Sequence, residues 1–532
     1  MVSRRSFLGS AVAVAGATVG FSTLSLPTAM AAPGGTPGST PEVILRPGDA
    51  RYAQLAGRGY NSRFAATPDE IWLVHNAAQV EKAVDQAISQ GQRITVRSGG
   101  HCFENLVDDP HFRLLVDLSE MRSVTFDPEM NAFCVQAGAR LGEVYQALYE
   151  GWGVTVPGGV CPEVGVGGHV SGGGYGPLSR RYGLVVDHLH AVEVVVAGRG
   201  GKARTIVATR NAGDPHRDLW WANTGGGGGG FGIVTRFWFR TPGATGPARS
   251  LLPKPPARVR KTVVSWPWDG LTEQGFTRLV RNHGAWHAAN SAPGSAYATL
   301  HSSLQLNSSV VGSVQLEIRM DATLAQTPAL HDRYIRAVSA GVGVEPTIDI
   351  TEGNWLELAL VPTPSYGEYT RQKSMGGHLR KPLNTRQIAA VYRSLTDSTH
   401  YGAGMVYLAA YGCRINTVAS SATAIPQRDS IFKLWYSNNW ADPAHDEVEV
   451  NWIRTLRTNV HGATGGFPVP NGQQDGGYIN YPDIDMRDPA QNTSGVPWYS
   501  IIWKDNYPRL QQVKNTYDPH NVFRHGLSLD PL

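Results

Sequence analysis

The chain has 532 residues, a formal net charge of +4, 17% charged residues and four cysteines. This length is enough for two or three domains with large cores. The near-neutral charge gives no reason to expect nucleic acid or an anionic membrane as a partner, and the cysteine spacing indicates no metal site. We interpret Cys102, Cys134 and Cys413 as small buried residues, while the sequence assigns no disulfide.

Residues 1–31 have the pattern of a twin-arginine export signal. Arg4 and Arg5 precede Phe7-Leu8 and an apolar, small-residue run, and Ala29-Met30-Ala31 supplies a cleavage site. The run is too rich in Gly and Thr for a spanning helix, and no other segment approaches the required length. We therefore predict a secreted protein that folds, with any bulky cofactor, before export. A disordered basic N-terminus is the alternative interpretation.

Residues 32–44 are rich in Pro, Gly, Ser and Thr and are predicted to be a linker. Residues 45–245 then alternate between strand and helix patterns. The clearest helix pattern spans 80–89, where apolar residues recur with helical spacing between two apolar strands. The predicted strands are 71–74, 94–97, 114–118, 133–137, 192–197, 205–207 and 232–239, with a second helix at 141–149. This pattern predicts an α+β region.

Glycine-rich segments interrupt this region at three places. Residues 97–101 read Arg-Ser-Gly-Gly-His, residues 157–176 are glycine-rich around Cys161, and residues 225–230 are all glycine. Glycine lets backbone N–H groups converge on an anion such as a dinucleotide pyrophosphate without side-chain obstruction. The GxGxxG fingerprint of NAD-binding folds is not the pattern here, so a Rossmann NAD site is the weaker interpretation.

Residues 241–256 are rich in Pro, Gly and Ala, and we predict a second domain over 246–477. Its predicted strands are 296–306, 309–320 and 404–411, and its predicted helices are 273–289 and 446–460. In the last of these, Val448, Trp452, Leu456 and Val460 share one face. An antiparallel sheet backed by helices follows. Residues 478–532, with a helix predicted at 498–514, are expected to return to the first domain.

Five motifs stand in one order along the chain. They are RSGGH at 97–101, GGVCPEVGVGGHVSGGGYGPLSRRYGLVVDHL at 158–189, GGGGGGFGIVTRF at 225–237, YINYPDIDM at 478–486 and YDPHNVF at 517–523. In this order they resemble the berberine-bridge-enzyme-like FAD-linked oxidases, in the bicovalent-flavin group that includes glucooligosaccharide oxidase and aclacinomycin oxidoreductase. The resemblance implies a two-part FAD-binding domain of the vanillyl-alcohol-oxidase (PCMH) type, residues 45–245 and 478–532, with an inserted α+β substrate domain.

The resemblance also implies that FAD is attached covalently, through His101 to the 8α-methyl carbon and through Cys161 to ring carbon C6. A thiolate or neutral imidazole is the competent nucleophile; a capping histidine and a buried cysteine are the alternatives. His169, Tyr175 and Asp187 are interpreted as supports or flavin hydrogen-bond partners. Further predicted lining residues are Arg97, Ser98, Gly99, Gly100, Gly158, Val160, Val164, Gly165, Gly168, Gly172, Gly173, Gly174, Gly176, Gly232, Ile233, Val234 and Asn480.

By the same resemblance, a tyrosine of the 478–481 motif takes the hydroxyl proton of an alcohol substrate. We predict Tyr481 as base and Tyr478 as its partner, although the two could be exchanged or both be core aromatics. A Tyr pKa near ~10 requires a site that stabilises phenolate or transfers the proton concertedly. Residues 371–378 offer no match to the family's second tyrosine, and the open candidates are Tyr366, Tyr369, Tyr407 and Tyr436.

These assignments predict a secreted FAD-dependent oxidase that dehydrogenates a CH–OH group, at an oligosaccharide reducing end or on a glycosylated natural product. A small residue at Val164 is associated in the family with oxygen access and hydrogen peroxide formation. Tryptophans of the inserted domain could stack on sugar or aromatic rings or could be core: Trp266, Trp268, Trp355, Trp435 and Trp440. The alternatives are a non-catalytic flavin-fold binding protein and a dehydrogenase with an acceptor other than O2.

Overall fold

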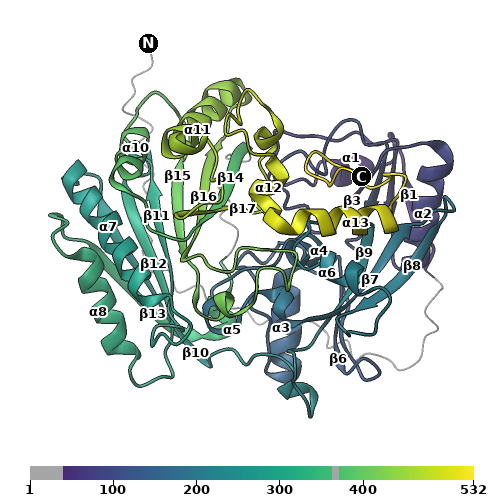
Figure 1. The fold of residues 1–532 in the computed structure, drawn as a ribbon, viewed down its shortest axis with the longest axis horizontal. Helices are drawn as coiled ribbons and strands as arrows, with labels where there is room; N and C mark the ends of the chain where they lie inside the picture. The colour runs from purple at the N-terminus through teal and green to yellow at the C-terminus, as the bar shows by residue number, and fades with distance from the viewer. Residues whose placement is uncertain (1–39, 362–370) are drawn as a thin grey trace. The chain divides into compact units, whose positions relative to one another are not determined.

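The computed structural model describes residues 40–361 and 371–532, and residues 41–532 form one compact unit. The predicted export signal and the candidates Tyr366 and Tyr369 lie outside the described residues. Within the described part, the strands form three sheets with four, five and eight strands (Figure 1). No helix in these ranges combines the length and apolar character that a membrane span requires.

The four-stranded sheet is built on the predicted strand–helix–strand unit. Its elements are β1 (Val43–Leu45), β2 (Glu70–Leu73), β3 (Ile94–Arg97) and β4 (Leu114–Asp117), with α1 (Tyr52–Ala56) and α2 (Ala77–Gln90). The helix α2 begins where the Asn76 side chain accepts the Gln79 N–H and ends at Gly91, which has φ 62°. The order is β1-β2-β4-β3, in which β4 is parallel to both β2 and β3.

The five-stranded sheet is antiparallel and has the order β5-β6-β9-β7-β8. Its strands are β5 (Val124–Asp127), β6 (Ala132–Gln136), β7 (Leu189–Ala197), β8 (Ala203–Thr209) and β9 (Ile233–Phe239). Helix α2 contacts β4 of the first sheet and β7 and β8 of this one, so it lies between the two sheets. Every residue of β7 is buried and its sequence is almost continuously apolar, so its other face is covered as well.

Short helices and turns connect the strands of this part. Helices α3 (Leu141–Trp152), α4 (Val166–Ser171) and α5 (Ser179–Tyr182) lie between β6 and β7, and α6 (Arg217–Ala222) lies between β8 and β9. The predicted helix at 141–149 is therefore confirmed and is extended to Trp152. The glycine-rich segment around Cys161 lies between α3 and α4, which places it at the edge of the core rather than in a long free loop.

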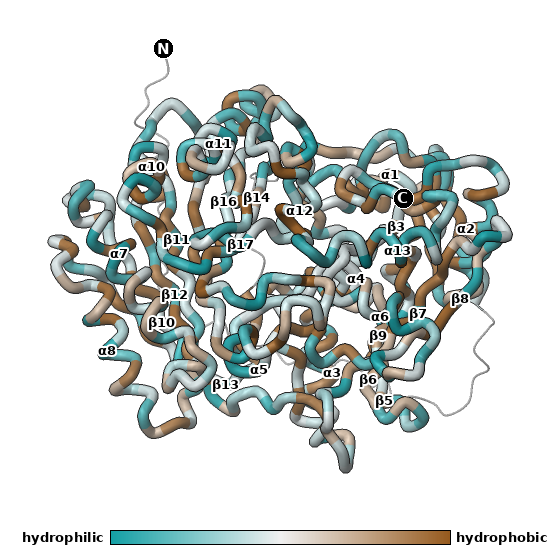
Figure 2. Tube along the Cα trace, viewed as in Figure 1, coloured by the Kyte–Doolittle hydropathy of each residue, from teal (hydrophilic) through white to brown (hydrophobic). Residues whose placement is uncertain are grey.

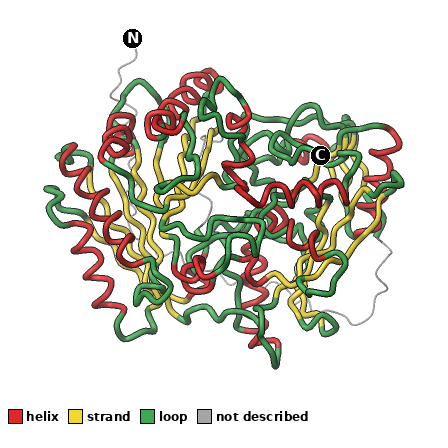
Figure 3. The backbone as a smooth tube through the Cα atoms, in the orientation of Figure 1, coloured by secondary structure: helices red, strands yellow, loops and turns green. Residues whose placement is uncertain are grey.

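The eight-stranded antiparallel sheet follows in the chain, with the order β13-β10-β12-β11-β15-β16-β14-β17. Its strands are β10 (Arg258–Pro267), β11 (His301–Asn307), β12 (Ser313–Asp321), β13 (Thr347–Asn354), β14 (Arg371–Leu379), β15 (Met405–Ala410), β16 (Phe432–Trp440) and β17 (Gln474–Gly477). Its helices are α7 (Glu273–Asn290), α8 (Thr327–Ser339), α9 (Trp355–Ala359), α10 (Thr385–Leu395) and α11 (Asp446–Val460). The predicted fold class, an antiparallel sheet backed by helices beside an α+β region, is confirmed (Figure 3).

Strand alternation divides this sheet into two faces. Leu304, Leu306, Leu316 and Ile318 are fully buried in one cluster with side chains from α7, α8, α10 and α11. Figure 2 shows hydrophobic and hydrophilic residues alternating along α7 and α8, as a helix with one core-facing side requires. The intervening strand residues point to the opposite face of the sheet, where the core helices do not lie.

Four local predictions are wrong. The strand predicted at 296–306 begins only at His301, because residues 296–299 form a turn. The strand predicted at 309–320 begins only at Ser313, because residues 309–311 form a 3-10 turn that ends at Gly312 with φ 93°. In α11, Val448 is 45% exposed, and the buried face includes Ile453 instead. The helix predicted at 498–514 is broken at Lys504, which has φ 49°.

The C-terminal segment is consequently two helices, α12 (Trp498–Trp503) and α13 (Tyr507–Tyr517). Trp503 Nε1 donates to the Gly225 carbonyl at 3.0 Å, and Lys514 Nζ donates to the Gly230 carbonyl at 2.8 Å. These bonds fix the glycine run at 225–230 against the end of the chain, as expected for a segment that returns to the first region. The domain boundaries at 245 and 477 stay predictions.

Two glycines provide a matched test of the packing. A Cβ at Gly138 would lie 1.7 Å from the Leu118 carbonyl oxygen, whereas a Cβ at Gly151, on exposed helix α3, would meet nothing within 4 Å. We expect Gly138→Ala to destabilise the protein by about 1–3 kcal/mol and Gly151→Ala to stabilise it by up to about 1 kcal/mol. Thermal unfolding followed by circular dichroism measures both, and equal melting temperatures would contradict this packing.

Candidate active site

A cavity of about 480 Å³ joins the first region, the C-terminal segment and the open face of the eight-stranded sheet. Cavities of ~300–1,000 Å³ are typical of ligand and cofactor sites. Eighteen of the predicted site residues line it: Arg97, Ser98, Gly99, Gly100, His101, Val160, Cys161, Val164, Gly165, Gly168, His169, Tyr175, Gly176, Ile233, Val234, Tyr478, Asn480 and Tyr481. These residues come from four of the five motifs, and Phe523 of the fifth also lines the cavity, so folding brings all five motifs together.

His101 follows β3 and faces this cavity with a neutral ring. It stacks on Tyr60 with ring centroids 4.1 Å apart. Burial lowers the pKa of His101 to about 4, although Glu163 acts in the opposite direction. Its buried Nε2 has no hydrogen-bond partner within the described ranges, which is unusual for a buried polar atom and indicates a missing partner. A neutral imidazole near pH 7 is nucleophilic.

The segment that carries Cys161 is held by hydrogen bonds to both backbone groups of a single residue, Gly159. The Gly159 N–H donates to His169 Nε2 at 3.2 Å, and the Gly159 carbonyl accepts from the Tyr145 hydroxyl at 2.8 Å. His169 is itself anchored, because its carbonyl accepts from Asn480 Nδ2 at 2.9 Å. Cys161 is half-buried, and none of the four cysteines, all of which lie in the described part of the chain, forms a disulfide. The thiol is thus held at the wall that His101 also lines.

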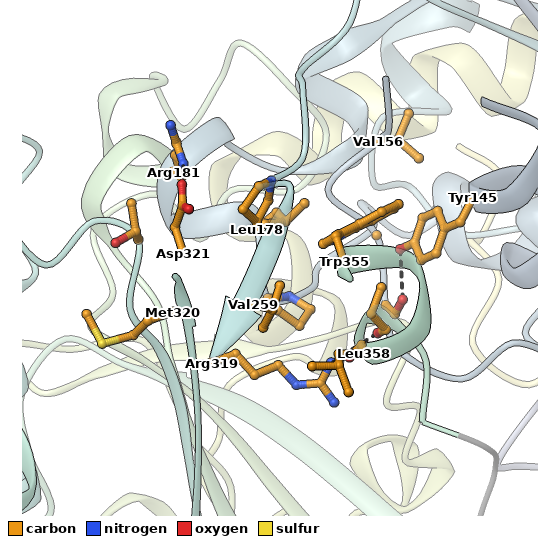
Figure 4. Close-up of a pocket in the computed structure, with 16 residues that line it drawn as sticks. Tyr145, Val156, Leu178, Arg181, Val259, Arg319, Met320, Asp321, Trp355 and Leu358 are labelled. Atoms are coloured by element: carbon orange, nitrogen blue, oxygen red, sulfur yellow. Dashed lines mark hydrogen bonds and ion pairs between the residues drawn. The ribbon is translucent and has the colours of Figure 1, made fainter. Parts of the chain in front are cut away.

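A small pocket of about 40 Å³ adjoins the main cavity and shares Gly159 and Pro177 with it (Figure 4). Tyr145 and Trp355 lie on one side, and the Arg181–Asp321 ion pair, at 2.6 Å, lies on the other. This pocket is too small for a dinucleotide. We interpret it as packing space behind the Cys161 segment.

The wall of the main cavity is partly bare backbone. A Cβ at Gly168 would meet nothing within 4 Å, and at Gly228 it would meet nothing closer than 3.7 Å. Close approach also explains Gly99, whose Cβ would lie 2.3 Å from the Gly165 nitrogen. The segments at 97–101 and 157–176 therefore pack backbone against backbone at Gly99 and Gly165, and at Gly168 they leave a side of the wall without side chains, which is compatible with a pyrophosphate cradle.

Six predicted site residues do not line the cavity: Gly158, Gly172, Gly173, Gly174, Asp187 and Gly232. Gly158 lines the small pocket instead. A Cβ at Gly172 would lie 2.0 Å from Asn480 Oδ1, and one at Gly232 would lie 2.4 Å from the Val195 carbonyl oxygen. Asp187 forms an ion pair with Arg428 at 2.7 Å. These residues support the packing behind the wall.

Tyr478 and Tyr481 lie at the junction of the three parts, and a buried lysine lies between them. The Lys433 Nζ is 4.0 Å from the ring centroid of each and 4.5 Å from that of Tyr175. Burial raises the pKa of both Tyr478 and Tyr481 and lowers that of Lys433 well below its ordinary value, since desolvation penalises each charged form. A protonated Lys433 beside these rings would favour a phenolate, and a phenolate would favour the protonated lysine, so the two charged forms would support each other.

Sequence reasoning missed Lys433, although strand alternation could have found it. Residues 432, 434 and 436 of β16 are buried in the helix-backed core, so 433 and 435 point to the cavity. A lysine at such a position, among the apolar residues 432 and 434–436, is a functional signal. The same face adds further lining residues that were not predicted: His301, Ser303, Gln305, Glu317 and Met405.

The aromatic candidates of the inserted domain fall into two groups, those that line the cavity and those in or against the core. Trp435 and Tyr407 line the cavity, and Trp435 stacks on Tyr481 at 5.1 Å. Burial raises the pKa of Tyr407 to about 12. The other candidates are core residues or pack against the core: Trp266, Trp268, Trp355, Trp440 and Tyr436. Trp435 and Tyr407 are therefore the described aromatic candidates able to meet a substrate.

Comparison with known proteins agrees with the geometry. The FAD binding domain family matches residues 68–205, and the berberine and berberine-like family matches residues 477–530. The aclacinomycin-N/aclacinomycin-A oxidase of Streptomyces galilaeus is 52% identical over 99% of this chain and 98% of that protein. The hexose oxidase of Chondrus crispus is 27% identical over 89% of this chain and 92% of that protein.

Solved structures of similar fold also belong to oxidases and oxidoreductases. The crystal structure of aclacinomycin oxidoreductase has a TM-score of 0.91 and 52% identity, and covers 92% of this chain and 100% of that one. A glycopeptide hexose oxidase complexed with teicoplanin has a TM-score of 0.89 and 48% identity over 92% of this chain and 99% of that one. Glucooligosaccharide oxidase from Acremonium strictum, which carries 6-S-cysteinyl, 8α-N1-histidyl FAD, has a TM-score of 0.76 over 92% of this chain and 97% of that one; its 22% identity shows the fold alone.

The chain belongs to the berberine-bridge-enzyme-like FAD-linked oxidases. It is a FAD-dependent oxidoreductase, which confirms the predicted family, fold class and enzyme class. The described residues fit the cofactor, since the cavity is large enough, its glycine wall is open and His101 presents an unpartnered buried nitrogen. The individual roles of the site residues stay predictions.

Proposed function

We propose that the protein oxidises a CH–OH group of a sugar or of a glycosylated natural product, with O2 as the final acceptor and hydrogen peroxide as product. The observation that carries this proposal is the convergence of His101, Cys161 and Tyr481 on one cavity whose opposite wall is polar and aromatic. The relatives named for aclacinomycins and hexoses support the substrate class. FAD, when bound, supplies a two-electron acceptor for the hydride.

In this proposal, His101 and Cys161 attach the cofactor covalently. Each attachment removes one hydrogen from the side chain and one from the cofactor, and O2 takes the two electrons and is reduced to hydrogen peroxide. The neutral ring of His101 and the half-buried thiol of Cys161 are the nucleophiles. Two bonds would fix the cofactor and leave the sheet-lined side of the cavity free for a bulky substrate.

Tyr481 is the proposed base for the substrate hydroxyl, with Tyr478 as its partner. Lys433 lies 4.0 Å from both rings, where its ammonium favours the phenolate that burial disfavours. Trp435 and Tyr407 supply flat surfaces for sugar or aromatic rings. Val164, which also lines the cavity, is small enough to leave oxygen a path, in accord with an oxidase rather than a dehydrogenase.

Anaerobic bleaching of the flavin absorbance tests the function. We expect bleaching by members of a panel of cello-, malto-, xylo- and chito-oligosaccharides and glycosylated polyketides, with recovery and peroxide formation in air. Tyr481→Phe is expected to slow bleaching by about 10²–10⁴-fold, because a general base is lost, and Tyr392→Phe, which lies outside the cavity, should not slow it. Bleaching without recovery in air would favour a dehydrogenase, and no bleaching by any compound would favour a binding protein.

Removal of the Lys433 charge is expected to shift the pH dependence of bleaching. The phenolate is the active form, so the rate rises with pH through the apparent pKa of the base. Lys433→Met removes a cation that favours phenolate, and the rising limb should move to higher pH by about one unit or more. Lys381→Met, at an exposed position after β14, is the control. An unchanged profile for Lys433→Met would exclude this role.

We also propose export through the twin-arginine pathway. Its support is the sequence of residues 1–31, with Arg4 and Arg5 ahead of the apolar run. Replacement of both arginines by lysine should leave the flavin-loaded precursor inside the cell, and fractionation of cells that express both forms measures this. Equal amounts outside the cell would contradict the proposal.

A further inference from the structure

The turn that follows His101 is tied directly to strand β14. Asn61 Nδ2 donates to the Phe103 carbonyl at 2.7 Å and to the Gln372 carbonyl at 2.9 Å. The neighbouring residue on β14, Lys373, donates to Glu104 Oε2 at 2.6 Å. Sequence analysis found no functional candidate in 371–378, whereas the structure shows that this strand contacts the proposed cofactor-attachment turn.

The same lysine also contacts the segment that carries the proposed base. Lys373 Nζ lies 2.8 Å from Asp483 Oδ1 and 3.4 Å from Asp485 Oδ2. Glu104 is three residues after His101, and Asp483 is two residues after Tyr481. The side chains of Lys373, Glu104 and Asp483 are each 3% exposed or less. One buried ammonium thus joins two chain segments that are distant in the sequence.

The network around Lys373 is asymmetric. Asp483 also pairs with Arg457 at 2.8 Å, and Asp485 also pairs with Arg454 at 2.7 Å. Among the described residues, Glu104 forms an ion pair with Lys373 alone. Loss of the lysine charge would therefore leave the aspartates with direct partners and Glu104 buried with only the more distant charges of Arg63 and Arg454, which is the costly arrangement. The disturbance would fall on the His101 turn.

We propose that Lys373 is a positioning residue that fixes the His101 turn relative to the Tyr481 segment and so determines how efficiently His101 attaches the cofactor. This inference rests on the proposed attachment by His101 and Cys161. The Cys161 segment is held separately, by Tyr145 and His169 at Gly159. Lys373 should therefore affect one of the two bonds and not the other, which a general loss of stability would not do.

The experiment measures each bond by itself. Cys161→Ala leaves attachment to His101 alone, and His101→Ala leaves attachment to Cys161 alone. Lys373→Met is added to each parent, and the flavin absorbance that stays with acid-precipitated protein is compared at equal protein. We expect at least about a tenfold loss in the Cys161→Ala parent, since misplacement of a reacting group by about 1 Å can cost about 10²-fold in rate, and no loss in the His101→Ala parent.

Two further variants separate positioning from damage to the fold. Lys504→Met removes another lysine–aspartate pair, in which a half-buried lysine lies 2.5 Å from the buried Asp475. This pair makes no contact with Glu104, so the variant should leave both parents unchanged. Glu104→Gln combined with Lys373→Met removes the stranded charge and should restore most of the attachment to His101. If Lys373→Met alone does not fold, Glu104→Gln alone, which loosens the 2.6 Å bond and keeps the other pairs, should lower attachment to His101 selectively.

Equal attachment with and without Lys373→Met in the Cys161→Ala parent would overturn the inference, as would an equal loss in both parents. If Lys373→Met does not fold, unchanged attachment in Glu104→Gln would overturn it in the same way. A Cys161→Ala parent that holds no covalent flavin at all would instead show that the proposed attachment by His101 is wrong, and the inference would fall with it.

Discussion

The site depends on which charged groups surround the lysines that are buried away from water. Lys373 on β14 and Lys433 on β16 lie on adjacent, paired strands, and both are almost completely buried. Burial alone would lower the pKa of either lysine. For Lys373, the carboxylates of Asp483, Glu104 and Asp485 overcome that effect and raise the pKa above its ordinary value. For Lys433, burial prevails and the pKa falls well below 10.5.

This difference assigns different physical roles to two lysines in one sheet. A lysine whose charge is compensated by three carboxylates stays charged at every physiological pH, so it can hold segments together and cannot move protons. A lysine among tyrosine rings has a charge state that depends on its neighbours, so it can respond when a phenol loses its proton. The carboxylates around Lys373 therefore keep that lysine charged, and the aromatic rings around Lys433 leave its charge state able to change.

Much of this fold could be predicted from the sequence because the relevant signals are local. The strand–helix–strand unit at 71–97 follows from apolar periodicity, an Asn cap and a terminal glycine, all within one short segment. The break at Lys504 could not be predicted, because it depends on contacts of Trp503 and Lys514 with carbonyls at 225 and 230. Local pattern favours a continuous helix there, and tertiary hydrogen bonds prevail over it.

The glycine-rich motifs of the site also depend on tertiary contacts that the local sequence does not show. Sequence resemblance treats residues 165–176 as one cofactor-binding run, but the structure uses neighbouring glycines for different purposes. Gly168 opens to the cavity, whereas Gly172 gives space to the Asn480 side chain that anchors His169. Glycine suits both positions, because a Cβ at Gly168 would enter the space proposed for the cofactor and a Cβ at Gly172 would overlap Asn480. Only the three-dimensional contacts distinguish a residue that would meet the cofactor from one that holds the wall in place.

Strand alternation in the eight-stranded sheet connects these observations with substrate choice. One face of the sheet must be apolar because α7, α8, α10 and α11 cover it. The alternate residues point to the other face and can vary without loss of core packing. Gln305, Glu317, Tyr407 and Trp435 occupy such positions and face the cavity. Substitutions there would change the polarity and shape of the wall proposed to face the substrate, while the proposed attachment residues and the proposed base come from other segments. A family built this way can change its substrate without disturbing the parts of the site that hold the cofactor.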